Sequence, residues 1–165
     1  DEYWITNYTA ETRGFQGTLD NEIFLDLSES LSNEFYEQFD VVFNHTVLEH
    51  IFEVNIAFEN LCQLSKDLVI IVVPFLQEQH AKYGDYWRFS PQAINNLFIK
   101  NNLETIYLNY NDTRNTSIYI FAIGSKQPDR WQYIKEDLDN KINGVNKILI
   151  GKKIISNGIL AKILG

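Results

Sequence analysis

Residues 39–73 decide the fold: FDVVFNHTVLEHIFEVNIAFENLCQLSKDLVIIVV. Residues 39–44, FDVVFN, form a continuous run of aromatic and β-branched side chains, which is typical of a strand covered on both faces. In residues 47–64 the apolar side chains recur every three or four positions, as in an amphipathic helix. Residues 68–73, LVIIVV, predict a second buried strand, which Pro74 ends. A strand, a helix and a strand within about 35 residues have the size of one right-handed βαβ unit.

The residues before this unit predict shorter elements. Residues 3–8, YWITNY, and 22–25, EIFL, are rich in aromatic and β-branched side chains and predict two short strands. The stretch between them contains two glycines and favours a loop. Residues 28–35 predict a turn of helix, with Ser28 as its N-cap.

The residues after the βαβ unit predict a long loop, a helix and a hairpin. Residues 75–89 are polar and aromatic, and a loop of about 15 residues inside a compact domain is usually functional. Ser90, followed by proline, predicts a helix start. Two apolar stretches, 103–110 and 117–123, flank a polar loop and predict a β-hairpin. The chain is expected to be helical again from Pro128.

Composition indicates an acidic globular domain with a basic tail. The 165 residues are 45% hydrophobic and 14% aromatic, enough for one sizeable core. Every acidic residue lies at or before Asp139, and residues 1–140 carry a net charge of −13. Residues 141–165 contain five lysines and no acid, a net charge of +5. We therefore expect a domain at 1–140 and a basic tail at 141–165. An acidic body repels phosphate backbones, which argues against nucleic acid as a partner.

The tail has two interpretations. Isoleucines lie near helical spacing between the lysines, and a basic amphipathic helix can bind an anionic membrane surface. Alternatively the tail docks against the acidic body or against a second subunit, as in a homodimer. Cys62 is expected to be a buried small hydrophobe, which fits a reducing, cytoplasmic setting. No apolar run approaches the roughly 18 residues that span a bilayer.

Two motifs resemble those of class I S-adenosylmethionine-dependent methyltransferases. FDVVFNHTVLEH, residues 39–50, resembles their fourth-strand motif, and PFLQEQHAKYGDYWRFSP, residues 74–91, resembles the loop after their fifth strand. With EIFLDLSESL, residues 22–31, the resemblance covers roughly residues 22–123. It implies a three-layer, Rossmann-like α/β fold, whose mostly parallel sheet ends in an antiparallel hairpin, and S-adenosylmethionine as the cofactor. The first strand and glycine-rich loop of the family have no counterpart, so an N-terminally truncated version is expected.

Five residues are expected at the cofactor because of this resemblance. Asp26 and Leu27 match positions that meet the adenine in the family. Asn44, His45 and Thr46 match the segment that lines the methionine part of the cofactor. All of them lie at the carboxyl ends of predicted strands, where ligands of open parallel sheets bind. The structural alternatives are a helix-capping or loop carboxylate for Asp26 and an ordinary loop histidine for His45.

Three residues of the long loop are catalytic candidates. His80 is expected to be the general base, because an unperturbed imidazole pKa near 6.5 suits proton removal at neutral pH. The aromatic face of Tyr86 would attract a sulfonium cation or lie against the acceptor. Arg88 is expected to pair with Asp85 and hold the loop closed. The alternative for His80 is a solvent-exposed loop histidine.

The sequence predicts a methyltransferase that acts on a small-molecule or sugar-containing acceptor, with a leaning towards surface-glycan biosynthesis. The alternative is a methyltransferase-like binding or scaffolding domain without catalysis, which the missing glycine-rich loop motivates. Glu49 and His50 stay open between a structural role and a place in the site. No residues are predicted to bind a metal.

Overall fold

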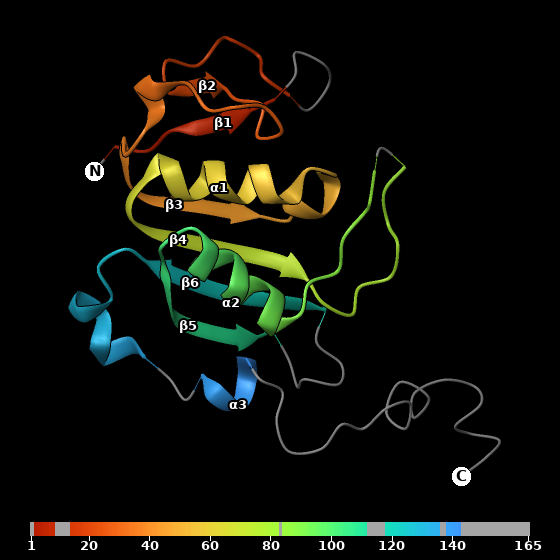
Figure 1. Ribbon diagram of the computed structural model, residues 1–165. Helices are drawn as coiled ribbons and strands as arrows, with labels where there is room; N and C mark the ends of the chain where they lie inside the picture. The colour runs from red at the N-terminus through yellow and green to blue at the C-terminus, as the bar shows by residue number, and fades with distance from the viewer. Residues whose placement is uncertain (1, 9–13, 83, 112–117, 136–137, 143–165) are drawn as a thin grey trace, which may run out of the picture.

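The computed structural model describes residues 2–8, 14–82, 84–111, 118–135 and 138–142 (Figure 1). The strands within these residues are β1 Ile5–Asn7, β2 Glu22–Phe24, β3 Phe39–His45, β4 Ser65–Pro74, β5 Glu104–Tyr110 and β6 Tyr119–Ser125. The α-helices are α1 Val54–Leu64, α2 Pro91–Lys100 and α3 Asp139–Ile142. The 3₁₀ helices are η1 Asn33–Phe35, η2 Leu48–His50 and η3 Pro128–Ile134. From β3 to β5 strands and helices alternate along the chain.

The main sheet joins four strands in the order β3-β4-β6-β5. β3 and β4 are parallel neighbours, with Asn44 opposite Ile71 and His45 opposite Val72. β6 lies antiparallel between β4 and β5. The predicted α/β fold is thus confirmed, including the parallel pair, the helix that connects it and the closing antiparallel hairpin.

The two N-terminal strands form a separate, two-stranded parallel sheet at the top of Figure 1. The segment after β2 is held to α1 by Asn60, whose side chain is buried. The Asn60 amide donates to the carbonyl of Leu27 over 2.9 Å and to that of Glu29 over 2.7 Å. One polar side chain of α1 therefore positions the residues expected to meet the adenine.

Helices α1 and α2 pack on the same face of the main sheet (Figure 1). Between them the rings of Phe58 and Phe98, both fully buried, meet edge to face with centroids 5.1 Å apart. Cys62 belongs to the same core, and burial raises the pKa of its thiol to about 12. A thiol held in its neutral form is a poor nucleophile, so Cys62 is the structural hydrophobe that the sequence predicts.

Two local predictions need correction. The helix expected over residues 47–64 is interrupted, because the Trp87 indole donates over 3.0 Å to the carbonyl of Ile51. A continuous helix would use that carbonyl for its own hydrogen bond. Ser28 is not an N-cap: its hydroxyl donates to Asp26 over 2.6 Å, and the helical turn begins only at η1. Ser90 does cap α2, accepting from the amide of Ala93.

The basic tail expected at residues 141–165 lies almost wholly outside the described residues. Only Lys141 and Ile142 are described, and they end α3. The predicted boundary at residue 140 thus falls within this short helix. None of the helices in the described part of the chain is long and apolar enough to cross a membrane.

Asp67 fastens β4 to the segment that follows β6. One of its carboxylate oxygens accepts from the Ser125 hydroxyl and from the amide of Gln127, and the other accepts from the Trp131 indole over 3.0 Å. Burial alone would raise the pKa of this carboxyl, but these hydrogen bonds favour the charged form and lower the pKa. The native state therefore stabilises the ionised carboxylate.

We expect Asp67→Asn to lower the free energy of unfolding at pH 7 by about 1–3 kcal/mol, because hydrogen bonds to a charged group are lost. The pKa of the Asp67 carboxyl is lower in the folded protein than in the unfolded protein. The stabilisation is therefore fully present above the ordinary carboxyl pKa near 4, and it is lost as the pH falls through the folded pKa. Urea unfolding from pH 7 to pH 2 measures it. Asp40→Asn, at an exposed site, is the control. If the free energy of unfolding fell equally with pH in the wild type and in Asp67→Asn, the assignment would be contradicted.

Candidate functional site

The carboxyl ends of β3 and β4 form one rim, which we call the strand rim (residues 44–46 and 74). The amide of Thr46 donates to the carbonyl of Val72 over 2.9 Å and fixes the two ends side by side. Asn44 is 5% exposed, and its side-chain oxygen has no hydrogen-bond partner in the structure. A buried acceptor without a partner is costly. A ligand that donates to Asn44 would remove this cost.

His45 and Thr46 complete the strand rim. The Nδ1 atom of His45 lies 3.0 Å from the Thr46 hydroxyl, and the imidazole packs against the ring of Tyr119. The backbone of Thr46 has a φ of 51°, which is strained for a β-branched residue. Asn44, His45 and Thr46 thus lie at the carboxyl end of β3.

Asp26 and Leu27 follow β2, on the other sheet. An oxygen of Asp26 accepts from the amide of Ser28 over 2.9 Å and from the Ser28 hydroxyl over 2.6 Å. Both contacts use the Oδ1 atom of Asp26 within a local turn. Leu27 is buried in the core. Neither residue is part of the strand rim.

The long loop, residues 75–89, begins directly after β4 and contacts η2. The amide of Phe75 donates to Ile118 and that of Phe89 to Pro74, which fastens both ends of the loop. Near its middle, the amide of Tyr86 donates to the carbonyl of Glu49 over 2.7 Å. The long loop is therefore held by main-chain contacts to three separate elements.

Asp85 and Arg88 form the clamp that the sequence predicts. The side chain of Asp85 is fully buried and meets the guanidinium of Arg88 through two hydrogen bonds, of 2.5 and 2.9 Å. Arg88 also donates to the carbonyls of Gln77 and Glu78. The hydrogen bond from Arg88 holds the pKa of Asp85 well below its usual range. These contacts make Arg88 a positioning residue of the long loop.

The aromatic side chains of the long loop divide into two groups. Tyr86 is 52% exposed, and its ring meets that of Phe52 edge to face at 5.3 Å. Trp87 is half-buried and Phe89 is buried, and both pack against the core. Among the aromatic residues 86, 87 and 89, Tyr86 is thus the most exposed.

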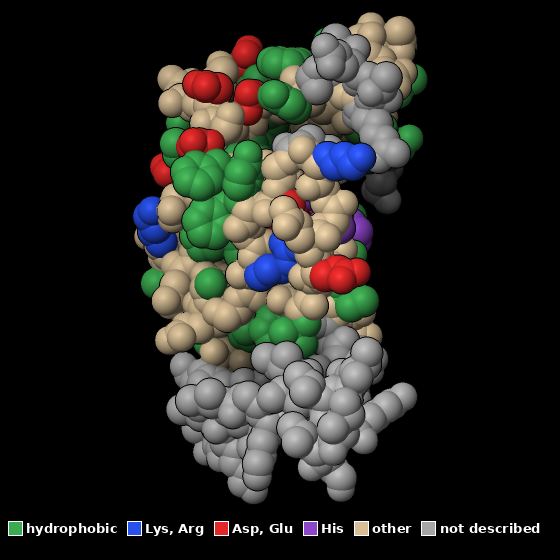
Figure 2. Space-filling model, turned by 90° about the vertical axis from the view of Figure 1, so that its right-hand side faces the viewer, with side chains coloured by type: hydrophobic (Ala, Val, Ile, Leu, Met, Phe, Trp, Pro, Cys, Tyr) green, Lys and Arg blue, Asp and Glu red, His purple; other side chains and the backbone are tan. Residues whose placement is uncertain are grey.

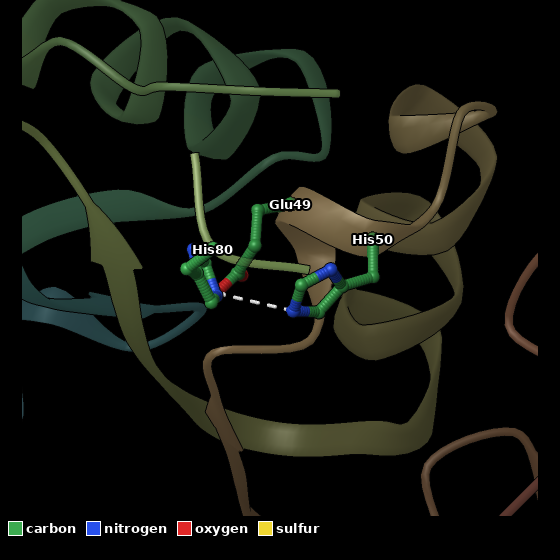
Figure 3. Close-up of side chains that lie close together, drawn as sticks. All are labelled: Glu49, His50 and His80. Atoms are coloured by element: carbon green, nitrogen blue, oxygen red, sulfur yellow. Dashed lines mark ion pairs between the residues drawn. The ribbon is translucent and has the colours of Figure 1, made fainter. Parts of the chain in front are cut away.

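Glu49 and His50 of η2 meet His80 of the long loop, and we call these three residues the Glu-His-His cluster (Figure 3). Glu49 is fully buried, and neither of its carboxylate oxygens has a hydrogen-bond partner in the structure. Burial raises the pKa of this carboxyl. His50 Nε2 lies 3.8 Å from Glu49 Oε1, and the two imidazole centroids are 5.3 Å apart.

Sequence reasoning missed the burial of Glu49. An acid in the first turn of a helix is normally exposed and favours the helix dipole. Here the interruption of the helix turns Glu49 inward. The one signal was its position in VLEHI, where apolar residues surround the acid on both sides.

Figure 2 faces the side of the molecule towards which the strands β3 and β4 point; an apolar patch lies on the left of this face, and histidine shows at its right-hand edge. One hollow, of ≈ 470 Å³, lies elsewhere and is lined by Tyr107, Phe121, Ile123, Tyr133, Ile134 and Lys135. A second, of ≈ 400 Å³, also excludes the strand rim and the Glu-His-His cluster.

Comparison with solved structures identifies the fold. The chain is similar to the 1,6-didemethyltoxoflavin-N1-methyltransferase of Burkholderia thailandensis, with a TM-score of 0.51 and 13% identity, over 64% of this chain and 50% of that one. This chain has the class I methyltransferase fold. No protein-family model and no curated protein matches the sequence.

Other structures with the methyltransferase fold are also similar to the chain. They include the magnesium protoporphyrin IX methyltransferase of Synechocystis PCC 6803, with a TM-score of 0.48 and 13% identity over 64% of this chain and 51% of that one. The CMeT domain of the citrinin polyketide synthase has a TM-score of 0.49 and 4% identity, over 64% of this chain and 32% of that one. The chain spans about half the length of the toxoflavin and protoporphyrin enzymes.

Proposed function

We propose that this chain belongs to an S-adenosylmethionine-dependent methyltransferase that acts on a small molecule. One observation carries the proposal: β3 and β4 are parallel neighbours that deliver Asn44–Thr46 and Pro74 to one rim, and an aromatic loop begins directly after Pro74. Ligands of open parallel sheets bind at such rims. The similar toxoflavin enzyme was solved with S-adenosylhomocysteine and its small-molecule acceptor bound, which supports the assignment.

The residues on the strand rim suit part of the cofactor. S-adenosylmethionine supplies an activated methyl group on a sulfonium. The unpartnered oxygen of Asn44 would accept a hydrogen bond from the methionine part. Asp26 would accept from the amino group of the adenine, with Leu27 beside it. His45 and Thr46 would line the same end of the sheet.

The long loop would serve the acceptor. Methyl transfer is an in-line displacement, so alignment of the acceptor supplies much of the rate acceleration. Arg88 holds the loop through Asp85, and the exposed ring of Tyr86 would contact the acceptor or the sulfonium. His80 would take the proton from an acceptor hydroxyl.

The negative charge of residues 1–140 supports a small-molecule acceptor over nucleic acid. The resemblance of residues 74–91 to proteins that modify glycans supports a sugar-containing acceptor within this class. A cytoplasmic location, membrane contact through the tail and a homodimer remain predictions from the sequence.

Titration calorimetry of the full-length protein with S-adenosylhomocysteine tests the proposed function. We expect saturable binding, and we expect Asn44→Ala to weaken it by roughly 10-fold, because one hydrogen bond to the ligand is lost. Asn55→Ala is the matched control, since Asn55 lies exposed on α1. No binding at millimolar ligand would contradict the proposal and favour the scaffolding alternative.

A further inference from the structure

We propose that Glu49, His50 and His80 form a binding site for a divalent metal ion of the zinc type. Each side chain offers one ligand atom, and these atoms all lie within 4.8 Å of one another. Figure 3 shows the three side chains converging from η2 and the long loop. The inference goes beyond the proposed function, because an ion could bind whether or not a methyl donor does. It also replaces the expectation that the chain holds no metal ligands.

The ligand set matches zinc chemistry. Two imidazoles and one carboxylate are a set that holds catalytic zinc and leaves a coordination position open. Zinc bonds of about 2.0–2.2 Å place tetrahedral ligand atoms roughly 3.4 Å apart. His50 Nε2 and Glu49 Oε1, 3.8 Å apart, are already close to that spacing. Side-chain rotations that move the ligand atoms by about 1 Å would close the shell around an ion.

Both histidines are oriented as metal-binding histidines are. Such a histidine usually donates its other ring nitrogen to a backbone carbonyl or a carboxylate. His50 Nδ1 lies 2.6 Å from the carbonyl of Gly84. His80 Nδ1 lies 3.4 Å from the Asp85 carboxylate, which Arg88 holds in turn. These contacts assign each Nδ1 to an outer partner and set the orientation of each ring.

Glu49 gives an independent reason for a cation. Its side chain is fully buried, and both of its oxygens lack hydrogen-bond partners in the structure. A buried carboxylate is tolerated when it is paired or when it coordinates a metal. The neighbouring histidines by themselves leave both oxygens without a hydrogen bond, whereas a bound ion would complete the environment of Glu49.

The ion would change how an acceptor loses its proton, and this consequence rests on the proposed function. A hydroxyl that coordinates the ion through the open position becomes more acidic, so its proton leaves to solvent and a metal–oxygen bond remains. His80 then serves as a ligand instead of as the proton acceptor. His80 is either a metal ligand or the proton acceptor. A rate of methyl transfer that depends on the metal ion would indicate the ligand role.

Calorimetric titration of the chelator-treated, full-length protein with zinc chloride tests the site, and the visible spectrum of the cobalt(II) form reports its coordination. We expect one ion per chain, with binding weakened by roughly 10-fold or more in Glu49→Gln and His80→Ala. His45→Ala, the matched control, removes a histidine that lies outside the cluster and should bind zinc as the wild type does. No stoichiometric binding, or equal binding by Glu49→Gln, would overturn the proposal.

Melting temperatures separate the metal site from a structural role. Glu49→Gln keeps the shape of the side chain and removes a buried charge, so the metal-free variant should melt no lower than the wild type. Zinc should raise the melting temperature of the wild type and leave that of Glu49→Gln unchanged. An equal shift in both proteins would overturn the site. If the protein binds zinc but not S-adenosylhomocysteine, only the proposed methyltransferase function is refuted. If it binds S-adenosylhomocysteine but not zinc, only the metal site is refuted.

Discussion

Replacing His80 with alanine should lower the rate of methyl transfer by roughly 100-fold or more, with the affinity for S-adenosylhomocysteine retained. The amide of His80 donates to Asp85 over 2.9 Å, and the imidazole lies next to His50. The histidine is thus held in the long loop by a contact that alanine keeps, and only the imidazole is lost. Rates would be measured with methyl-labelled S-adenosylmethionine and an acceptor found by screening small hydroxyl compounds.

Two comparisons sharpen the His80 experiment. Gln79→Ala alters an exposed neighbour in the same loop and should leave the rate unchanged. A chelator added to the wild type should reproduce the loss if an ion on the Glu-His-His cluster activates the acceptor. The chelator should have no effect if the imidazole itself takes the proton. An unchanged rate in His80→Ala would exclude His80 from the reaction.

Gly124→Ala should lower the free energy of unfolding by about 2–3 kcal/mol, the largest effect on stability that we expect from adding a single methyl group. Gly124 lies in the central strand β6, and a Cβ atom there would meet two ring carbons of Phe98 at 2.4 Å. Phe98 is fully buried against Phe58 and has little room to move. The entropic gain of about 0.5–1 kcal/mol from replacing glycine would offset only part of this overpacking. Urea unfolding of the full-length protein measures the difference.

A second substitution tests the cause of the Gly124 effect. Phe98→Leu makes room at the point of contact, so the double variant should lose less stability than the sum of the two single variants. Additive losses would show that the clash with Phe98 is not the source. Ile123→Val, on the opposite face of β6, should cost about 1 kcal/mol and serves as the control.

The central strands and the hairpin could be predicted because their signals are local. The apolar runs at 39–44 and 68–73 lie within β3 and β4, and the hairpin strands differ from prediction by one or two residues at their ends. The break in the helix over residues 47–64 could not be predicted, because it depends on Trp87, 36 residues from the carbonyl that it contacts. Long-range hydrogen bonds of this kind leave no periodic pattern in the sequence.

The candidate site likewise contains residues whose place could be predicted from the sequence and residues whose place could not. Residues 44–46 and Pro74 share the strand rim because the ends of adjacent parallel strands lie side by side, and the motifs indicated both strands. The Asp85–Arg88 pair, three residues apart, could be expected from sequence proximity. The Glu-His-His cluster could not, since it depends on the turn at η2 and on the contact of His50 with Gly84, 34 residues away.

The backbone conformation of Thr46 costs the protein stability. Its left-handed backbone costs a β-branched residue about 1–2 kcal/mol, which glycine or asparagine would largely avoid. Selection for thermal resistance alone would therefore favour a smaller or more permissive residue at this corner. The hydroxyl of Thr46 lies against the imidazole of His45. A glycine at this position would avoid the backbone strain but lose this contact, so stability and the polar contact at the strand rim place opposing demands on residue 46.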